Sequence, residues 1–170
     1  DEIGELPLTQ QTSLLRVLQE RRFRPLGGTR EETSDFRLLA ATNRDLEEMS
    51  KQQHFRSDLL YRLQSFALHL PPLRERGGDI RELARHRLKH LCDRYGVPAK
   101  GISSDYLDAL EAHAWPGNVR ELFNVIESSL AEARDDDLLF PKHLPTSLRV
   151  LVAQSRVADP VFAREVPLPS

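Results

Sequence analysis

The chain has 170 residues, of which 24 are Lys or Arg and 26 are Asp or Glu, so its formal net charge is −2. This length accommodates one globular domain or two small ones, and the balanced charge argues against a protein that holds nucleic acid mainly by bulk positive charge. No run approaches the roughly twenty apolar residues that span a bilayer, which excludes a membrane protein. The single cysteine, Cys92, excludes an internal disulfide framework and indicates an intracellular protein. The chain begins Asp1-Glu2, without an initiator Met or a targeting segment, and we expect it to be a piece of a longer protein.

The first 34 residues predict a helix and then a hairpin. The leucines within residues 14–18 form one apolar face in a polar stretch, which is the spacing of an amphipathic helix that ends near Glu20. Residues 21–34 contain a proline and a Gly-Gly pair, so we expect a hairpin or a projecting loop.

Two later segments predict strands. Residues 36–41 are a nearly continuous apolar run, as in a strand buried on both faces, and residues 66–70 predict a second short strand. Residues 55–63 between them predict a helix. If no neighbouring strand covers residues 36–41, this segment is expected to pair with another copy or to remain an exposed apolar edge.

The pattern becomes purely helical from Gly77 onward, which divides the chain into three parts. Residues 1–76 are expected to be an α/β portion and residues 77–146 a helical subdomain, which the apolar residues 138–144 would close. Residues 147–170 are punctuated by prolines and are predicted to be a linker or tail.

Signals at helix ends predict three helices in the subdomain. Asp79 is a candidate N-cap for the first helix, and Gly96 would stop it. Ser103 or Ser104 would start the second. Asn118 and the glutamate three residues later resemble a capping box for the third.

Two short polar motifs are candidates for nucleotide chemistry. In nucleotide triphosphatases one carboxylate of an acidic pair such as Asp1-Glu2 holds Mg²⁺ while its neighbour activates water. A solvated acidic pair is the simpler alternative. Thr42-Asn43, at the end of its predicted strand, could orient a water or sense a γ-phosphate, and the alternative there is an Asx-turn that ends the strand.

Three arginines are candidates for phosphate contacts. Arg56 and Arg62 straddle the apolar stripe of the helix predicted at 55–63, and they could reach a phosphate across a subunit boundary. Two surface arginines, one paired with Asp58, are the alternative. Arg120 lies in the first turn of its helix, where a cation opposes the helix dipole, so either an anion or a salt bridge to Glu121 or another acid is expected beside it.

Six segments in this order strongly resemble the AAA+ domain of bacterial sigma-54-dependent transcriptional activators, the enhancer-binding proteins. The resemblance covers residues 1 to about 144 and rests on these segments: DEIGEL (1–6), LLRVLQE (14–20), AATNRDL (40–46), FRSDLLYRL (55–63), LPPLRER (70–76) and WPGNVREL (115–122). It implies an α/β AAA+ ATPase core, truncated at the Walker B motif, followed by an all-helical lid.

The resemblance implies a role for each candidate at the carboxylate end of the site. Asp1 would lie on the Mg²⁺ side of Walker B, and Glu2 would activate the hydrolytic water. Thr42 and Asn43 would form sensor I.

The resemblance also implies roles for the three arginines and for partners. Arg56 and Arg62 match the two arginines proposed to act on the neighbouring subunit's ATP, and the sequence does not rank them. Arg120 would be sensor II in the lid. Such proteins are cytoplasmic, form rings that are typically hexamers, use ATP and Mg²⁺, and remodel the closed promoter complex of sigma-54 RNA polymerase. Promoter or enhancer DNA would be bound by a domain outside these residues.

One departure from the family pattern limits what the chain is expected to do alone. No Gly-x-x-x-x-Gly-Lys-Ser/Thr occurs in the 170 residues, so nothing cradles the α- and β-phosphates, and we expect the isolated chain to be inactive. Two alternatives remain open at this point. One is a AAA+ remodelling ATPase of another branch, and the other is a non-enzymatic helical DNA-binding module.

Overall fold

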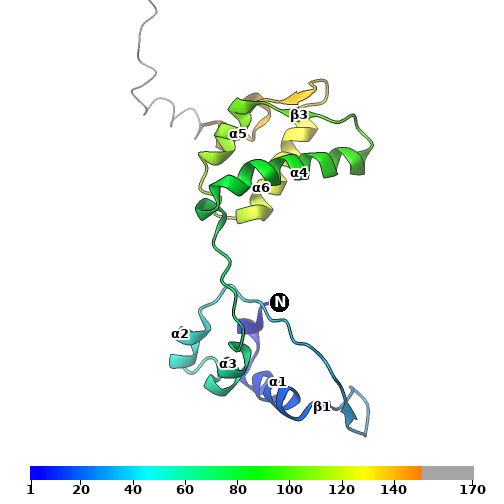
Figure 1. Cartoon of the computed structure of the whole chain (residues 1–170), viewed down its shortest axis with the longest axis vertical. Coiled ribbons are helices and arrows are strands. Elements are labelled where there is room, and N and C mark those ends of the chain that lie inside the picture. The colour runs from blue at the N-terminus through cyan, green and yellow to red at the C-terminus, as the bar shows by residue number, and fades with distance from the viewer. Residues whose placement is uncertain (151–170) are drawn as a thin grey trace, which may run out of the picture. The chain divides into compact units, whose positions relative to one another are not determined.

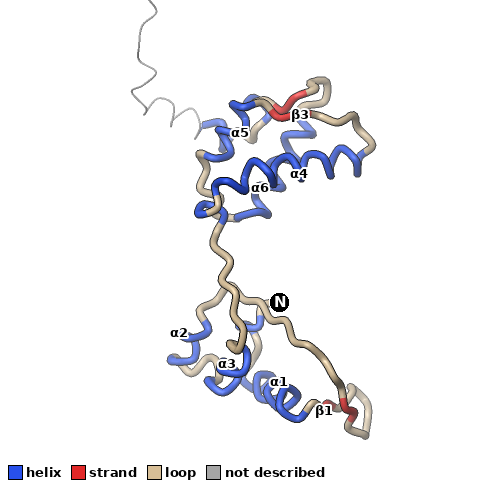
Figure 2. The backbone as a smooth tube through the Cα atoms, in the orientation of Figure 1, coloured by secondary structure: helices blue, strands red, loops and turns tan. Residues whose placement is uncertain are grey.

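The computed structural model describes residues 1–150, which fall into two compact units that divide between His69 and Leu70 (Figure 1, Figure 2). Most of the predicted tail, residues 151–170, lies outside the described residues, whereas residues 146–150 are helical. No helix among residues 1–150 is long and apolar enough to cross a membrane.

The first unit contains four helices or helical turns and one small hairpin. In chain order these are η1 (Ile3–Glu5), α1 (Leu8–Glu20), β1 (Arg22–Phe23), β2 (Glu32–Thr33), α2 (Leu46–Lys51) and α3 (Ser57–Leu63). Strands β1 and β2 pair antiparallel, so the predicted helix and hairpin are both confirmed. Helix α2 was not predicted, and it begins after Asp45, whose carboxylate accepts hydrogen bonds from the N–H groups of Glu47 and Glu48 at 3.0 Å.

A small apolar core holds this unit together. Its buried members come from α1 and from the segment around α3: Leu15, Leu18, Phe55, Leu59 and Leu60. The apolar stripe predicted for residues 55–63 therefore faces the core, as its helical spacing requires.

The prediction of strands at residues 36–41 and 66–70 is wrong. Neither segment has strand structure, and Leu39 is 93% exposed while Leu68 is 78% exposed. A strand forms only when a neighbouring ladder satisfies its N–H and C=O groups. Among the described residues, residues 36–41 form one backbone hydrogen bond to a distant part of the chain. In it, the N–H of Ile3 donates to the carbonyl of Ala41 at 3.0 Å. Leu38 and Leu39 are both exposed in the single chain, and pairing of this segment with another copy stays a prediction.

The second unit is a helical bundle with one short strand pair. Its elements are η2 (Leu73–Glu75), α4 (Gly77–Tyr95), β3 (Gly101–Ile102), α5 (Ser104–Glu111), α6 (Asn118–Glu132), β4 (Leu138–Leu139) and η3 (Pro141–His143). Strands β3 and β4 pair in parallel, which brings residues 138–144 back onto the bundle.

Two of the predicted helix ends in this unit are confirmed and two are wrong, since neither Asp79 nor Asn118 is the N-cap of its helix. Gly96 ends α4 with φ 63°, and Ser103 caps α5 by accepting a hydrogen bond from the N–H of Tyr106. Asp79 does not cap α4, because the helix already begins at Gly77. Instead Asp79 lies in the first turn and forms a 2.5 Å ion pair with Arg76.

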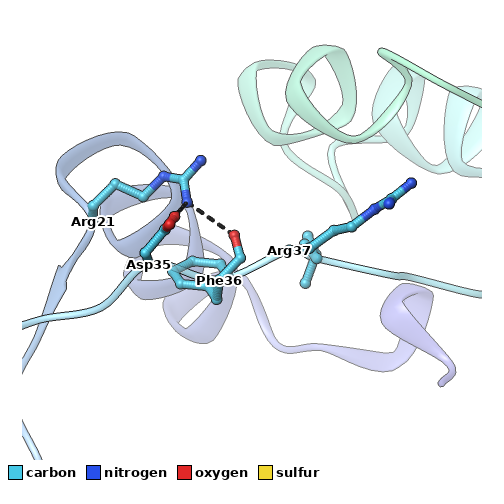
Figure 3. Close-up of a pocket in the computed structure, with 5 residues that line it drawn as sticks. Arg21, Asp35, Phe36 and Arg37 are labelled. Carbon is cyan, nitrogen blue, oxygen red and sulfur yellow. Dashed lines mark hydrogen bonds and ion pairs between the residues drawn. The ribbon is translucent and has the colours of Figure 1, made fainter.

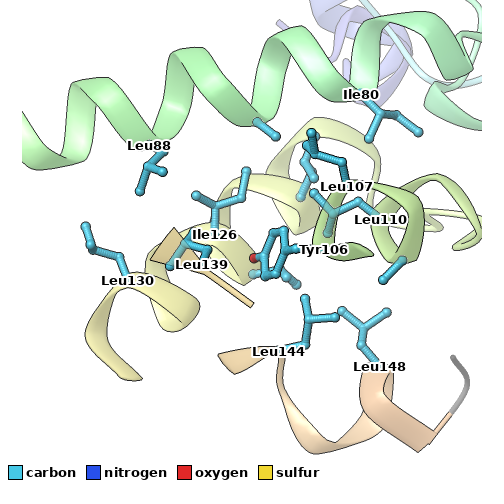
Figure 4. Packing of buried hydrophobic residues seen from close by; sticks show 14 of the residues in the cluster. Ile80, Leu88, Tyr106, Leu107, Leu110, Ile126, Leu130, Leu139, Leu144 and Leu148 are labelled. Atoms are coloured by element: carbon cyan, nitrogen blue, oxygen red, sulfur yellow. The ribbon is translucent and has the colours of Figure 1, made fainter. Parts of the chain in front are cut away.

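The core of the second unit is large and is supplied by every helix of the bundle (Figure 4). Leu88 of α4, Leu110 of α5 and Ile126 of α6 are all at most 2% exposed. The core also buries one polar pair, since the hydroxyl of Tyr106 donates to Ser129 Oγ at 2.8 Å. Burial raises the pKa of Tyr106 to about 12.

The bundle also includes residues before the predicted boundary at 76. Leu73 is 2% exposed and belongs to the same core as the three helices. Its N–H donates to the side-chain oxygen of Asn118 at 2.8 Å. These contacts explain why the compact units divide seven residues earlier, at His69 and Leu70.

Candidate nucleotide-sensing site

The acidic pair and the Thr-Asn motif, which are 40 residues apart in sequence, lie side by side in the first unit. The N–H of Ile3 donates to the carbonyl of Ala41, the residue before Thr42. Gly4 is buried against the same segment, and a Cβ placed on it would lie 3.0 Å from Thr42 Oγ1. The structure therefore brings the segment of Asp1 and Glu2 against the segment of Thr42 and Asn43.

All four of these candidate side chains are exposed to solvent. Glu2 has φ 55°, a left-handed conformation that is uncommon outside glycine and asparagine. Thr42 Oγ1 accepts a hydrogen bond from the N–H of Arg44 at 3.1 Å, so the turn that follows this segment uses the threonine hydroxyl. Asn43 makes no side-chain hydrogen bond to any of residues 1–150.

The two candidate arginines of the first unit have different surroundings. Arg56 precedes α3, and its guanidinium forms a two-pronged pair with Asp58, at 3.0 Å and 2.6 Å, and also donates to Thr12 Oγ1 at 3.3 Å. This pairing holds the pKa of Asp58 below its ordinary value and raises the pKa of Arg56. Arg62 donates to the carbonyl of Leu18 at 3.3 Å and forms no ion pair within residues 1–150.

Gln11 of α1 fixes the backbone from which Arg56 projects, a role that was not predicted from the sequence. Its side chain is fully buried and contacts three backbone groups: Nε2 donates to the carbonyls of Leu6 and His54, and Oε1 accepts from the N–H of Arg56 at 2.9 Å. The neighbouring Gln10 is exposed, so glutamine as a residue type gave no usable signal.

Arg120, in the second unit, is exposed at the start of α6 and has no ion pair within residues 1–150. The adjacent acid, Glu121, is engaged elsewhere. One of its oxygens accepts from the N–H of Gly117 at 2.8 Å, and the other lies 3.0 Å from His113 Nε2. Glu121 thus reaches back to the helix start as in a capping box, but its backbone partner is Gly117 and not Asn118.

One hollow of the first unit contains none of the candidate residues. Arg21, Asp35, Phe36, Arg37 and Leu38 line it. Arg21 bonds Asp35 at 3.0 Å and the carbonyl of Phe36 at 2.9 Å, whereas Arg37 points away from this pair (Figure 3).

The donor types suit a magnesium ion that is completed by a substrate. Mg²⁺ in nucleotide enzymes is held by one or two carboxylates together with phosphate oxygens and waters. The exposed carboxylate of Asp1 fits that requirement. No group of three or more His, Cys, Asp or Glu residues within residues 1–150 is placed to hold a metal by itself.

Comparison with known protein families decides the identity of both units. A sigma-54 interaction domain model matches residues 1–69, and an AAA+ ATPase lid domain model matches residues 74–159. The chain belongs to the family of sigma-54-dependent transcriptional activators. The resemblance found in the sequence is thereby confirmed, together with the AAA+ fold class and its helical lid.

Curated relatives agree with this assignment. The chain is 46% identical over 160 residues to nitrogen fixation protein VnfA of Azotobacter vinelandii, which covers 94% of the chain and 30% of VnfA. It is 51% identical over 127 residues to the alginate biosynthesis transcriptional regulatory protein AlgB of Pseudomonas aeruginosa, covering 75% of the chain and 28% of AlgB. The chain therefore spans about a third or less of these relatives.

Solved structures of NtrX from Brucella abortus share the fold. The crystal structure of NtrX in complex with ATP superposes with a TM-score of 0.81 at 33% identity and covers 89% of this chain and 35% of the NtrX chain. A complex of the same protein with ADP gives a TM-score of 0.80 at 34% identity.

Proposed function

We propose that this chain supplies the water-activating, nucleotide-sensing and lid portion of an ATPase that remodels the sigma-54 RNA polymerase closed complex in the cytoplasm. The main observation in support of the proposal is the backbone hydrogen bond from the N–H of Ile3 to the carbonyl of Ala41. It places the acidic pair beside the Thr-Asn motif within a sigma-54 interaction domain. The active form would be a homo-oligomeric ring, typically a hexamer, and DNA would be bound by a domain outside these residues.

The candidate residues divide the work by chemical type. Asp1 would hold Mg²⁺, which neutralises charge on the phosphates when it is bound. Glu2 would take a proton from the attacking water, and Thr42 with Asn43 would detect whether a γ-phosphate is present. Arg120 would report the same state to the lid.

The surroundings of the two arginines support a ranking that the sequence left open. Arg56 has a carboxylate partner in its own subunit, so reaching a neighbour's phosphate requires breaking a two-pronged ion pair. Arg62 gives up one long hydrogen bond to a carbonyl. We therefore assign Arg62 as the principal arginine acting in trans and Arg56 as a supporting residue.

The 170-residue chain by itself is expected neither to bind ATP tightly nor to hydrolyse it, because it lacks a P-loop. Isothermal titration with MgATP and a phosphate-release assay test this directly. Micromolar binding or steady turnover by the purified chain would overturn the expectation.

A VnfA hybrid tests the residue roles in a longer protein. In this hybrid, the 160-residue stretch of the chain that aligns with VnfA replaces the matching segment of VnfA, and unsubstituted VnfA serves as the reference. Glu2→Gln is expected to retain ATP binding while slowing hydrolysis by at least about 100-fold, the usual contribution of a general base. A variant that hydrolyses ATP at the original rate would remove Glu2 from the proposed mechanism.

The same hybrid tests the ranking of the arginines. Arg62→Ala is expected to slow hydrolysis by about 1,000-fold, as loss of an arginine finger does, and Arg56→Ala by much less. Arg37→Ala is the matched control, since Arg37 is exposed and has no ion pair within residues 1–150. Mixing Arg62→Ala subunits with Glu2→Gln subunits should restore part of the activity, because each kind supplies what its neighbour lacks. Failure of the mixture to recover any activity would contradict action in trans.

A further inference from the structure

The start of α6 is built on an unusual backbone turn. Trp115 and Asn118 both have φ 51°, in the left-handed region, and the N–H of Asn118 donates to the carbonyl of Trp115 at 2.8 Å. Trp115 is 1% exposed, and its ring N–H donates to the carbonyl of Leu110 at 2.8 Å. The tryptophan thus fixes one side of the turn in the core, and the turn determines where the side chain of Asn118 points.

Asn118 uses that position to hold the first buried residue of the lid unit. Its side-chain oxygen accepts the N–H of Leu73 at 2.8 Å across 45 residues of sequence. Leu73 lies in the entry segment, residues 70–76, which follows directly on the first unit in the chain. Leu73 is 2% exposed, so its N–H has little access to water and depends on this acceptor.

Arg120 follows Asn118 by two residues, within the same first turn of α6. The turn around Asn118 is held on one side by the buried tryptophan and on the other by the entry segment. Any displacement of the N-terminal turn of α6 that accompanies binding of an anion at Arg120 therefore moves the acceptor of the Leu73 N–H as well.

We propose that Asn118 is a positioning residue that couples Arg120 to the entry segment, so that the nucleotide state at Arg120 is transmitted to residues 70–76. The inference rests on the proposed role of Arg120. Asparagine suits the position because it tolerates a left-handed backbone and offers an uncharged oxygen acceptor on a short side chain.

Two substitutions separate the acceptor from the backbone conformation. Asn118→Gly keeps a residue that accepts positive φ but removes the oxygen. Asn118→Asp keeps the tolerance of positive φ and an oxygen acceptor, and differs from asparagine by its negative charge. Asn124→Ala is the matched control, because Asn124 is exposed on the same helix and makes no side-chain hydrogen bond within residues 1–150.

The first measurement is amide hydrogen exchange of the 170-residue chain by NMR. In Asn118→Gly the Leu73 amide should exchange at least about tenfold faster, while the amides of α5 keep their rates. Asn118→Asp and Asn124→Ala should change the Leu73 rate less than about threefold. An unchanged Leu73 rate in Asn118→Gly would overturn the proposal.

The second measurement follows the nucleotide response in the VnfA hybrid. MgATP should alter hydrogen exchange in residues 70–76 of the unsubstituted hybrid, and this response should disappear in Asn118→Gly and return in Asn118→Asp. The glycine variant should lower kcat at least about tenfold with KM for ATP within about threefold, while the amides of α5 keep their exchange rates, which shows that the lid is still folded.

The Arg120→Ala hybrid distinguishes failure of this inference from failure of the proposed function. If Arg120→Ala keeps the response of residues 70–76, the sensing role of Arg120 is wrong and the coupling fails with it. If Arg120→Ala abolishes the response and Asn118→Gly keeps it, the coupling through Asn118 alone is wrong.

Discussion

Removing the buried hydroxyls of Tyr106 and Ser129 singly and together tests how the lid core is held. Both residues are fully buried and their hydroxyls are 2.8 Å apart. Ser129→Ala leaves the phenol hydroxyl without a partner in apolar surroundings, which should lower the free energy of unfolding by about 1–3 kcal/mol. Tyr106→Phe should cost about 1 kcal/mol, because the serine hydroxyl loses the hydrogen bond that it accepts but can still donate to the carbonyl four residues earlier in α6. The double variant leaves no orphaned hydroxyl, so its cost should fall below the sum by about 1 kcal/mol or more.

The chain contains its own probe for this measurement. Trp115 is the single tryptophan and is 1% exposed in the lid unit, so its fluorescence follows unfolding of that unit. Urea denaturation of the four proteins at pH 7 gives the free energies of unfolding, with similar m-values expected throughout. Ser128→Ala, at the exposed neighbouring position of α6, is the matched control and should change stability by less than about 0.5 kcal/mol.

The test is whether the stability losses of the two single variants add up to the loss in the double variant. If the two single losses of free energy add up to the loss in the double variant within about 0.5 kcal/mol, the hydrogen bond between the two hydroxyls does not stabilise the lid core. A double-variant loss that is smaller than the sum by about 1 kcal/mol or more, together with unchanged stability in Ser128→Ala, supports the packing described for the bundle.

Three further outcomes follow from the structure. Burial raises the pKa of Tyr106 to about 12 from an ordinary value of 10.0, so the neutral phenol stabilises the lid fully below pH 10, and this stability, on the order of 3 kcal/mol, is lost as the pH rises from 10 to 12. Urea denaturation should show this loss in the unsubstituted chain but not in Tyr106→Phe. Gln11→Leu removes three hydrogen bonds and should destabilise the first unit by about 2–4 kcal/mol, seen as faster amide exchange in α1, with the tryptophan transition unchanged. Gly4→Ala places a Cβ 3.0 Å from Thr42 Oγ1, so it should destabilise the packing of residues 3–4 against residues 41–42 by about 1–3 kcal/mol. Hydrogen exchange of the Ile3 amide should then be faster, and an unchanged exchange rate would contradict the described packing.

The helical parts of the fold were predictable because a helix satisfies its own backbone. Helix α1 ends at Glu20 as expected, and Gly96 and Ser103 mark helix ends where the sequence placed them. The strand predicted at 36–41 failed for the opposite reason. Its apolar residues fit a buried strand, but a ladder depends on a partner strand that periodicity within one segment does not specify. Leu39 consequently lies 93% exposed.

The candidate site was predictable in composition but less so in its supporting contacts. The types and order of the motif residues located Asp1, Glu2 and Thr42, whose segments the structure brings together. Gln11 was missed because it acts through contacts with distant residues. His54 lies 43 positions further along the chain, and Arg56 lies 45 positions further. Burial of one polar residue in an amphipathic helix is decided by such distant partners, and neither spacing nor residue type reveals it.

Arg120 shows how the surrounding contacts narrow a choice that helical spacing leaves open. A cation in the first turn of a helix opposes the helix dipole at a cost of about 0.3–1 kcal/mol, which either an internal acid or an external anion can offset. The nearest acid, Glu121, already bonds Gly117 and His113 through its two oxygens. No carboxylate within residues 1–150 pairs with Arg120 in its place. The described part of the chain therefore supplies no carboxylate for Arg120, and a nucleotide phosphate beside it stays a prediction that Arg120→Ala in the VnfA hybrid tests.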